Sequence, residues 1–583
     1  MLNDAQTAAV NSTGELVVVR APAGSGKTRI LVARAMREIE EGRNPIIITF
    51  TRAAAREVEG RIENHSGLRY CGTLHGLAFD LLREYPQHLP EGLVRGAGGE
   101  WGVAGATVAH VADHMRKITG TDPRSQLHMS GLVSYDELLV YAIAILESAS
   151  EMGVLSTVLG CDAVLVDEAQ DLTYLEWKFV RLLCPRRFIV GDAAQAIYGW
   201  RGGQVGEFLK EYMAADAKVD LEVNYRSDSD IIAAANRLQV KGKVTMRGTK
   251  EKTSAAPSLW TLSPSAAVET IRLAQGTKKT CVVVARTRRS ANDASVALGR
   301  SQIMHRAPIQ YADVWTSAGG SIVAAAAHLL ANPFDDLHLA YLLSKSGLDD
   351  GTILRIEAER ATSMKPLWTF LSAGGEGMLG YWLPTFQVFI DSVALHRRGF
   401  IAASISSLTP ELERTPPWCA SLCRIVEAVL HAEIPPEYIL RPLLIQDMRL
   451  RQGCMALEVA NAWCDHPMSP ADGGPAEFLS WLADPHTSES ALLSEGEDGQ
   501  GPNILVTTIH GAKGGEWDRV VLWDCVEGSM PTHGDTREER TLDEARRLFY
   551  VATTRAIKDV VYVIGDDDDH KRPSRFLREA GVA

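Results

Sequence analysis

A lysine, a threonine and two glycines stand close together near the N-terminus, in a pattern suited to binding phosphate. Gly24, Gly26, Lys27 and Thr28 follow the apolar run at residues 16–19, so the order predicts a strand, a tight loop and the start of a helix. Glycines let backbone N–H groups face phosphate oxygens, while the lysine reaches the β and γ phosphates and the threonine hydroxyl binds Mg²⁺. The alternative is a glycine-rich turn that only caps a helix.

Two carboxylates end a second apolar run. Asp167 and Glu168 follow Ala163–Val166, at the carboxyl end of a predicted buried strand, where open α/β sheets bind ligands. Beside a phosphate loop, we expect Asp167 to hold the Mg²⁺ shell and Glu168 to orient and deprotonate an attacking water. The alternative is a solvated acidic strand end, but the two motifs together favour nucleotide hydrolysis over storage.

Apolar runs that alternate with helical patterns must position these residues. The alternation predicts parallel sheets with helices on their faces. Strands are expected at Leu16–Arg20, Pro45–Thr49, Ala163–Val166, 187–190, 218–223, Cys281–Ala285, 503–507, 519–523 and 559–564. Helices are expected after Lys27 and at 53–61, 135–147, 542–556 and most of 317–485. The simplest topology is therefore α/β, with two parallel-sheet domains that each carry a mainly helical insertion.

The expected domain boundaries follow the breaks in this alternation. The first sheet domain is expected at 1–80 and 156–225, with its insertion at 81–155. The second is expected at 226–316 and 498–583, with its insertion at 317–497. A chain of 583 residues also exceeds what one core comfortably supports.

Charge and hydropathy limit the possible partners. The 60 basic and 73 acidic residues give a net charge of -13, which argues against indiscriminate coating of nucleic acid but allows a local basic groove. No apolar run approaches the roughly 20 residues of a membrane span, and the N-terminus lacks the pattern of a signal peptide. We therefore expect no membrane partner and a cytoplasmic location.

Two clusters allow metal binding as an alternative. The first comprises Cys419, Cys423, Cys454, Cys464 and His466, whose spacing matches no zinc pattern, so buried thiols on helices are favoured. The second is the acidic run at 566–569, which is interpreted as a solvated turn.

Further segments, in order along the chain, resemble the motifs of superfamily 1 helicases of the UvrD/Rep/PcrA type. They are 49–54 and 72–75 for the first DNA-contacting motifs, 167–171 and 191–202 for the second and third motifs, and 224–227, 508–517 and 544–556 for the fourth to sixth. The resemblance implies two RecA-like motor domains with ATP between them.

The resemblance also assigns nucleotide contacts. Gln6 matches the glutamine that reads the adenine edge, Arg29 and Tyr225 match the pair that flanks the adenine ring, and Glu516 matches the ribose contact. An arginine plane and a phenol ring suit stacking on a base. The phosphate loop is expected to bind through Ala23, Gly24, Ser25, Gly26, Lys27 and Thr28.

Three further side chains match catalytic positions beside Glu168. Gln195 matches the γ-phosphate sensor, and Arg226 and Arg555 match the arginines that reach the transferred phosphoryl group. Such arginines neutralise charge in the transition state and are each worth on the order of 10³ or more in rate.

The same resemblance implies that single-stranded DNA, or a junction of single strand and duplex, crosses the tops of both sheets. Aromatic side chains would stack on bases in any sequence, at about 1 to 3 kcal/mol per base; for each aromatic taken alone, core packing is the alternative. The expected DNA contacts are Phe50, Arg52, His75, Tyr198, Trp200, Arg201 and His510.

The resulting prediction is an ATP-dependent DNA helicase, with 3′ to 5′ translocation implied by the family alone. Pro22 stands where the family usually has glycine, yet no catalytic group is missing. One alternative is a single-strand translocase or ATPase subunit of a repair, recombination or anti-phage complex with little unwinding of its own. A non-enzymatic, ATP-gated DNA scaffold and an RNA substrate are further alternatives.

Overall fold

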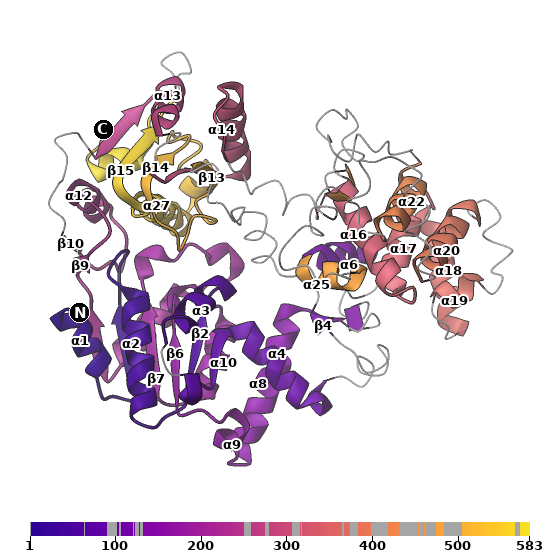
Figure 1. Cartoon of the computed structure of the whole chain (residues 1–583), viewed down its shortest axis with the longest axis horizontal. Helices are drawn as coiled ribbons and strands as arrows, with labels where there is room; N and C mark the ends of the chain where they lie inside the picture. Colours follow the sequence, from indigo (N-terminus) through magenta and orange to yellow (C-terminus); the bar gives the residue numbers. More distant parts are fainter. Residues whose placement is uncertain are drawn as a thin grey trace. The chain divides into compact units, whose positions relative to one another are not determined.

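The computed structural model divides the chain into two compact units, residues 1–85, 139–309 and 495–583, and residues 86–138 and 310–494 (Figure 1). It describes residues 2–62, 65–89, 102–103, 106–120, 122, 127–128, 132–249, 258–274, 279–305, 315, 317–363, 367–372, 383–397, 418–431, 453–454, 456–457, 460, 474–482, 504–565 and 572–582. The acidic run at 566–569 lies outside these residues.

The first unit contains a six-stranded parallel sheet in the order β3-β2-β6-β7-β1-β8. Its strands are β1 (Leu16–Arg20), β2 (Pro45–Thr49), β3 (Tyr70–Thr73), β6 (Ala163–Val166), β7 (Arg187–Gly191) and β8 (Ala217–Asp220). Val17 and Val19 share a hydrophobic core with Ile30, whereas Val18, equally buried, faces the opposite side of the strand. Burial on both faces explains why the central strands are continuous apolar runs.

Helices cover this sheet and lead into its loops. They are α1 (Asp4–Asn11), α2 (Lys27–Glu40), α3 (Arg52–Glu59), α4 (Leu74–Glu84), α8 (Tyr135–Glu151), α9 (Leu155–Leu159), α10 (Tyr174–Leu183) and α11 (Val205–Ala214). Helix α1 begins with a capping box, in which Asn3 and Gln6 exchange side-chain and backbone hydrogen bonds. The cap thus fixes Gln6 at the helix start.

The same unit contains a second, five-stranded parallel sheet in the order β11-β15-β14-β12-β13. Its strands are β11 (Leu259–Leu262), β12 (Cys281–Ala285), β13 (Ile504–Thr508), β14 (Trp517–Leu522) and β15 (Ala556–Val563). One face shares a core with α13 (Pro264–Ala274) and α14 (Arg288–Arg300), and the other with α12 (Ser229–Arg237), α27 (Glu539–Thr553) and α28 (Arg575–Ala580). The predicted fold of two RecA-like parallel-sheet domains is confirmed.

Several predicted element bounds were wrong. The single strand expected at 218–223 is two: β8 ends at Asp220, and β9 (Val223–Asn224) pairs with β10 (Arg247–Gly248) in a separate two-stranded sheet. Helix α27 ends at Thr553, and Ala556 already begins β15. Strand β3 was missed because its residues are all half-buried and mostly polar or small, so no apolar run announces it.

The second unit joins parts of both expected insertions around one hydrophobic core. Its described elements are β4 (Gly102–Val103), α6 (Ala106–Thr119), β5 (Leu132–Val133), α16 (Ala318–Ala331), α17 (Asp336–Lys345), α18 (Asp350–Ser363), α19 (Leu367–Ser372), α20 (Leu383–Arg397), α22 (Cys419–Leu430) and α25 (Pro475–Leu482). Val111 and Met115 of α6 belong to the same core as Ile322 and Leu342. His114 of α6 also packs edge-on against the ring of Tyr341, at 5.2 Å between ring centroids.

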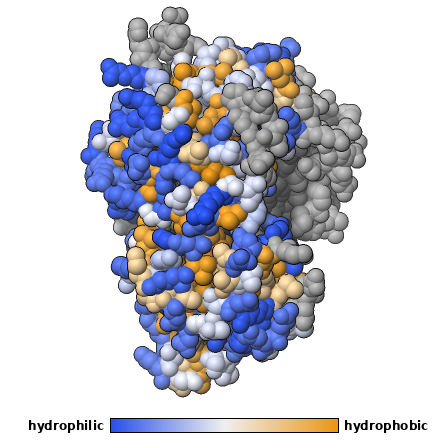
Figure 2. Space-filling model, turned by 90° about the vertical axis from the view of Figure 1, so that its left-hand side faces the viewer, coloured by the Kyte–Doolittle hydropathy of each residue, from blue (hydrophilic) through white to orange (hydrophobic). Residues whose placement is uncertain are grey.

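No helix within the described ranges is long and apolar enough to cross a bilayer. The face on the left of Figure 1 intersperses apolar and polar side chains among its coloured residues (Figure 2). Scattered apolar residues of this kind are ordinary for a protein surface and need no partner to cover them.

Candidate nucleotide site and nucleic-acid face

The phosphate loop lies between β1 and α2, and two of its glycines have positive φ. Gly24 has a φ of +67° and Gly26 a φ of +87°, a region in which glycine alone is unstrained. A Cβ on Gly24 would lie 2.7 Å from Arg226 Cβ, and one on Gly26 would lie 2.8 Å from Gln6 Nε2. Both glycines are therefore required by backbone conformation and by close neighbours.

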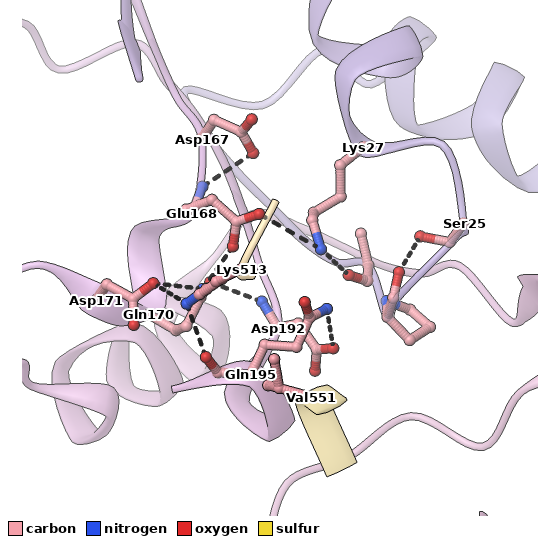
Figure 3. A network of polar contacts seen from close by, with 12 residues as sticks. Ser25, Lys27, Asp167, Glu168, Gln170, Asp171, Asp192, Gln195, Lys513 and Val551 are labelled. Atoms are coloured by element: carbon pink, nitrogen blue, oxygen red, sulfur yellow. Dashed lines mark hydrogen bonds and ion pairs between the residues drawn. The ribbon is translucent and has the colours of Figure 1, made fainter. Parts of the chain in front are cut away.

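Lys27 and Ser25 show how the loop is held. The Lys27 ammonium donates to the Ala21 carbonyl at 3.2 Å and lies 3.7 Å from Glu168 Oε1 (Figure 3). Ser25 Oγ donates to the Pro22 carbonyl at 2.7 Å, so the unusual proline supplies the acceptor that closes the turn. The Lys27 ammonium of the phosphate loop thus lies toward Glu168, at the end of β6.

Asp167 and Glu168 follow β6, as predicted, and both are largely buried. Asp167 accepts a hydrogen bond from the Glu168 backbone N–H at 2.9 Å, and Glu168 has a φ of +50°. For a residue other than glycine this conformation costs about 1 kcal/mol or more, so the fold holds Glu168 in a strained position of the kind found at functional sites.

The two carboxyl groups have opposite pKa shifts. Burial, and then the charge of Glu168, raise the pKa of Asp167. Burial also opposes ionisation of Glu168, but the Lys27 and Lys513 ammonium groups outweigh it and lower the pKa of Glu168. Glu168 is therefore ionised at neutral pH, as a group that accepts a proton must be.

A cavity of about 620 Å³ opens over the loop and the acidic strand end. Every predicted nucleotide-binding and catalytic residue lines it. They are Gln6, Ala23, Gly24, Ser25, Gly26, Lys27, Thr28, Arg29, Glu168, Gln195, Tyr225, Arg226, Glu516 and Arg555. The predicted metal ligand Asp167 is not among the lining residues and is 9% exposed directly after β6.

Residues from the C-terminal third of the chain complete this cavity. Arg226 Nε lies 2.7 Å from Glu516 Oε2, and Arg555 Nη2 donates to Gln195 Oε1 at 2.8 Å. Arg555 is only 3% exposed; burial, followed by repulsion from Arg226, lowers its pKa to about 9. A buried guanidinium beside a second arginine favours an anion as ligand.

The predicted adenine contacts also meet at the cavity. Gln6 Nε2 donates to the Ser25 carbonyl at 2.9 Å, and Asn3 Nδ2 donates to the Tyr225 hydroxyl at 2.7 Å. Arg29 lies along α2, two residues past its start. These contacts place the amide, the phenol and the guanidinium around the mouth of one cavity.

Glu57 and Arg61 also line the cavity and were missed from the sequence. They form an ion pair four residues apart, at 2.6 Å between Glu57 Oε1 and Arg61 Nη2, with Glu57 on α3 and Arg61 two residues past its end, and both side chains are 54% exposed. Such a pair is typical of a solvated helix face, so no local signal separates it from an ordinary surface pair.

Mg²⁺ fits the residues that are present. A hydroxyl at Thr28 and a carboxylate at Asp167 are oxygen ligands of the kind that this ion prefers, and Thr28 lines the cavity while Asp167 is buried at the end of β6.

An aromatic cluster spans both sheets of the first unit. Phe50 and Tyr198 stack at 5.0 Å between ring centroids, Tyr198 lies 5.7 Å from His510, and Trp200 meets His510 edge-on at 6.1 Å. Trp200 is 71% exposed, which excludes core packing for this side chain. Four of the predicted DNA contacts therefore lie together.

The remaining predicted DNA contacts lie around this cluster. The Arg201 guanidinium lies over the Phe50 ring at 5.4 Å, and Arg201 Nη2 and His75 Nδ1 lie 3.8 and 4.0 Å from the same Glu176 oxygen. Arg52 begins α3, two residues after Phe50. The predicted DNA contacts therefore lie together on one face instead of at scattered positions.

Of the four cysteines considered, Cys423 and Cys454 lie near each other: burial, and then Glu427 and Cys454, raise the pKa of Cys423. Cys454 belongs to the hydrophobic core of the second unit and Cys423 packs against it, as expected for thiols on helices. Cys419 begins α22, and Cys464 and His466 lie outside the described residues.

Another cluster in the second unit, His328, Asp335 and His338, brings potential metal ligands within 4.8 Å of one another. The two imidazole rings stack in parallel at 3.9 Å, however, so one ion could not lie near the planes of both. His338 Nδ1 instead lies 2.7 Å from Asp335 Oδ2, and we interpret the cluster as a hydrogen-bonded helix start.

Comparison with known proteins agrees with this geometry. Residues 2–92 and 104–216 match the UvrD/REP helicase N-terminal domain, and residues 486–564 match the UvrD-like helicase C-terminal domain. The chain is 26% identical to DNA helicase II of Escherichia coli K12, over 99% of this chain and 87% of the relative. It is 24% identical to the ATP-dependent DNA helicase PcrA of Leuconostoc citreum, over 99% and 84%.

Proposed function

Because the chain is a UvrD-like, ATP-dependent DNA helicase with both domains of that family, we propose that it translocates 3′ to 5′ on single-stranded DNA and unwinds the duplex ahead. Closure of the two motor domains on ATP drives each step. The observation that carries the proposal is the contact between Gln195 and Arg555, since it joins the two motor domains within the nucleotide cavity. The polarity rests on the family resemblance alone.

In this proposal the first motor domain comprises residues 1–80 and 156–225, and the second comprises 226–316 and 498–583. Residues 81–155 and 317–497 are their insertions. The phosphate loop and Glu168 come from the first motor domain, and Arg555 comes from the second. Neither domain alone holds a complete site, so hydrolysis requires both.

The residues of the cavity have distinct roles in hydrolysis. Lys27 and the glycine N–H groups hold the phosphates. Glu168 takes a proton from water as the water oxygen bonds to the γ phosphorus, and the bond from that phosphorus to the β–γ bridging oxygen breaks to leave ADP. Arg226 and Arg555 neutralise the charge that develops on the transferred group.

Arg226 must exchange partners during this cycle. Its guanidinium is held by Glu516 and by the Thr554 carbonyl, at 2.7 and 3.2 Å. A phosphate is a stronger partner for a guanidinium than a half-exposed carboxylate. Release of Glu516 would then allow it to contact the ribose.

Mg²⁺ would be held by Thr28 and Asp167, and when bound it withdraws charge from the phosphate oxygens. Gln6, Arg29 and Tyr225 would bind the adenine by an amide edge and by stacking. These assignments leave the loop and the two arginines to act on the phosphates.

The aromatic face would hold the DNA strand. Trp200, Tyr198 and Phe50 offer ring faces to bases of any sequence, and Arg52, Arg201, His75 and His510 surround them. Stacking that tolerates any sequence suits a motor that must step along every strand. Single-stranded DNA, and its junction with duplex, are the proposed partners.

Unwinding of partial duplexes with either a 3′ or a 5′ single-stranded tail tests the proposal. With ATP and Mg²⁺ we expect strand separation from the 3′ tail and none from Lys27→Ala protein. Separation only from the 5′ tail would overturn the polarity. Hydrolysis stimulated by single-stranded DNA without separation from either tail would favour a translocase that does not unwind duplex by itself.

A further inference from the structure

Three successive backbone carbonyls of the first motor domain accept hydrogen bonds from side chains of the second. The carbonyl of residue 195 accepts from Lys513 Nζ at 2.8 Å, that of residue 196 from Arg547 Nε at 2.6 Å, and that of residue 197 pairs with His510 Nε2 at 3.1 Å. A carbonyl can only accept, so His510 Nε2 carries the hydrogen. The whole segment 195–197 is thus held from across the domain interface.

This segment connects the nucleotide cavity with the aromatic face. At its start, the Gln195 side chain accepts from Arg555 inside the cavity. Directly after its end, Tyr198 stacks on Phe50 and lies beside Trp200. A shift of these three residues would therefore move a nucleotide contact and a DNA contact together.

We propose that Arg547 is a positioning residue that holds segment 195–197 to the second motor domain, so that DNA bound at the aromatic face accelerates ATP hydrolysis. This inference rests on the proposed function and names a residue that couples its two sites. Arg547 is not among the residues that line the nucleotide cavity, and it acts through the backbone that it holds.

Arg547 is better suited to test this coupling than its two neighbours. Lys513 also forms an ion pair with Asp171 (Figure 3), and His510 belongs to the aromatic face, so a change in either would affect a second contact. Arg547 donates to the carbonyl of residue 196. Of the acids near it, Glu544 and Asp543 are its own helix neighbours, and Asp171 of the first motor domain attracts it without an ion pair within 4 Å. The hydrogen bond to segment 195–197 is therefore its one direct bond to the first motor domain among the described residues.

The chain provides a matched control on the same helix. Arg546 precedes Arg547, and it pairs with Glu579 at 2.8 Å and with Asp543 at 2.6 Å, both within the second motor domain. Arg546→Gln and Arg547→Gln change the same charge at adjacent positions, but only Arg547→Gln loses a bond to the first motor domain.

The test compares ATP hydrolysis with and without single-stranded DNA for both variants. For Arg547→Gln we expect DNA-free hydrolysis and the KM for ATP within about twofold of wild type, with DNA stimulation reduced at least about tenfold, the loss expected for one hydrogen bond to a charged group. Arg546→Gln should keep the wild-type stimulation. Arg547→Lys, which can still donate to a carbonyl, should recover part of it.

Other outcomes would overturn the inference. Equal losses in both variants would show that the helix matters only for stability, and full stimulation in Arg547→Gln would show that this hydrogen bond does not couple the sites. If Arg547→Gln fails to fold, the test rests on Arg547→Lys alone. The inference then requires Arg547→Lys to lose part of the DNA stimulation seen in wild type. No stimulation in wild type would overturn the proposed function, and this inference with it.

Discussion

Replacing Arg555 by methionine should stabilise the nucleotide-free protein while abolishing its activity. Burial, with repulsion from Arg226, lowers the pKa of Arg555 from the usual 12.5 to about 9. At about 1.4 kcal/mol for each pH unit, the charged form is disfavoured by roughly 5 kcal/mol in the folded protein. This cost is fully present below pH 9 and falls as pH rises through the folded pKa, because the unfolded chain holds the proton more tightly.

The substitution also removes a favourable contact. Gln195 Oε1 loses the donor that lies 2.8 Å away, and an unpaired buried acceptor costs about 1 to 3 kcal/mol. The longer bonds from Arg555 to the Val551 carbonyl and the Thr554 hydroxyl, at 3.2 and 3.4 Å, are also lost, but both oxygens keep the Thr554 hydroxyl contacts with Val551 and Tyr550. The net gain in unfolding free energy is therefore roughly 2 to 4 kcal/mol. The ATPase rate should fall on the order of 10³-fold, because an arginine that neutralises the transition state is lost.

Thermal unfolding at pH 7.5 without nucleotide measures the first effect, and ATP turnover with single-stranded DNA measures the second. Arg546→Met is the control, because pairing with Glu579 raises the pKa of Arg546 despite burial, and its loss should not stabilise. A lower unfolding temperature for Arg555→Met than for wild type would refute the energetic reasoning. Near-normal turnover would refute the role of Arg555.

Three further results are expected. Trp200→Ala should weaken binding of single-stranded DNA about 5- to 150-fold in a fluorescence anisotropy titration, with an unchanged unfolding temperature, since the side chain is 71% exposed. Pro22→Gly should change nucleotide affinity only a few-fold, because the Ser25 bond uses a backbone carbonyl; loss of turnover would show that loop geometry depends on the proline. Val111→Asp places a carboxylate in the shared core of the second unit, so α16 and α17 should lose hydrogen-exchange protection together with α6, whereas Lys117→Ala, at an exposed position, should not affect them. Loss confined to α6 would show that the helix is dispensable to that core.

The sequence predicted the strands and loops whose structure is determined by their own residues. The central strands β1, β2, β6 and β12 have the bounds expected from continuous apolar runs, because burial on both faces leaves a plain signal. The phosphate-loop glycines, Gly24 and Gly26, were likewise predictable, because residue types other than glycine are strained at the positive φ that these positions have. The edge strand β11, with an exposed Trp260 and no apolar run, left no comparable pattern.

Long-range partners could not be predicted in the same way. Nothing near Val111 shows that α6 shares a core with helices about two hundred residues later. The bond from Arg547 to the carbonyl of residue 196 involves a backbone atom, and every residue type has that atom. The cavity-lining pair Glu57 and Arg61 resembles any solvated helix pair. In each case the information lies in the packing of distant segments, which a local pattern does not contain.

ATP turnover by Glu168→Gln in the presence of single-stranded DNA tests the central claim most directly. Glutamine keeps the shape of the side chain but cannot take a proton from water. We expect ATP binding to persist while turnover falls about 10²- to 10⁴-fold. Turnover at the wild-type rate would contradict the assignment of Glu168, and with it the account of this cavity as the site of hydrolysis.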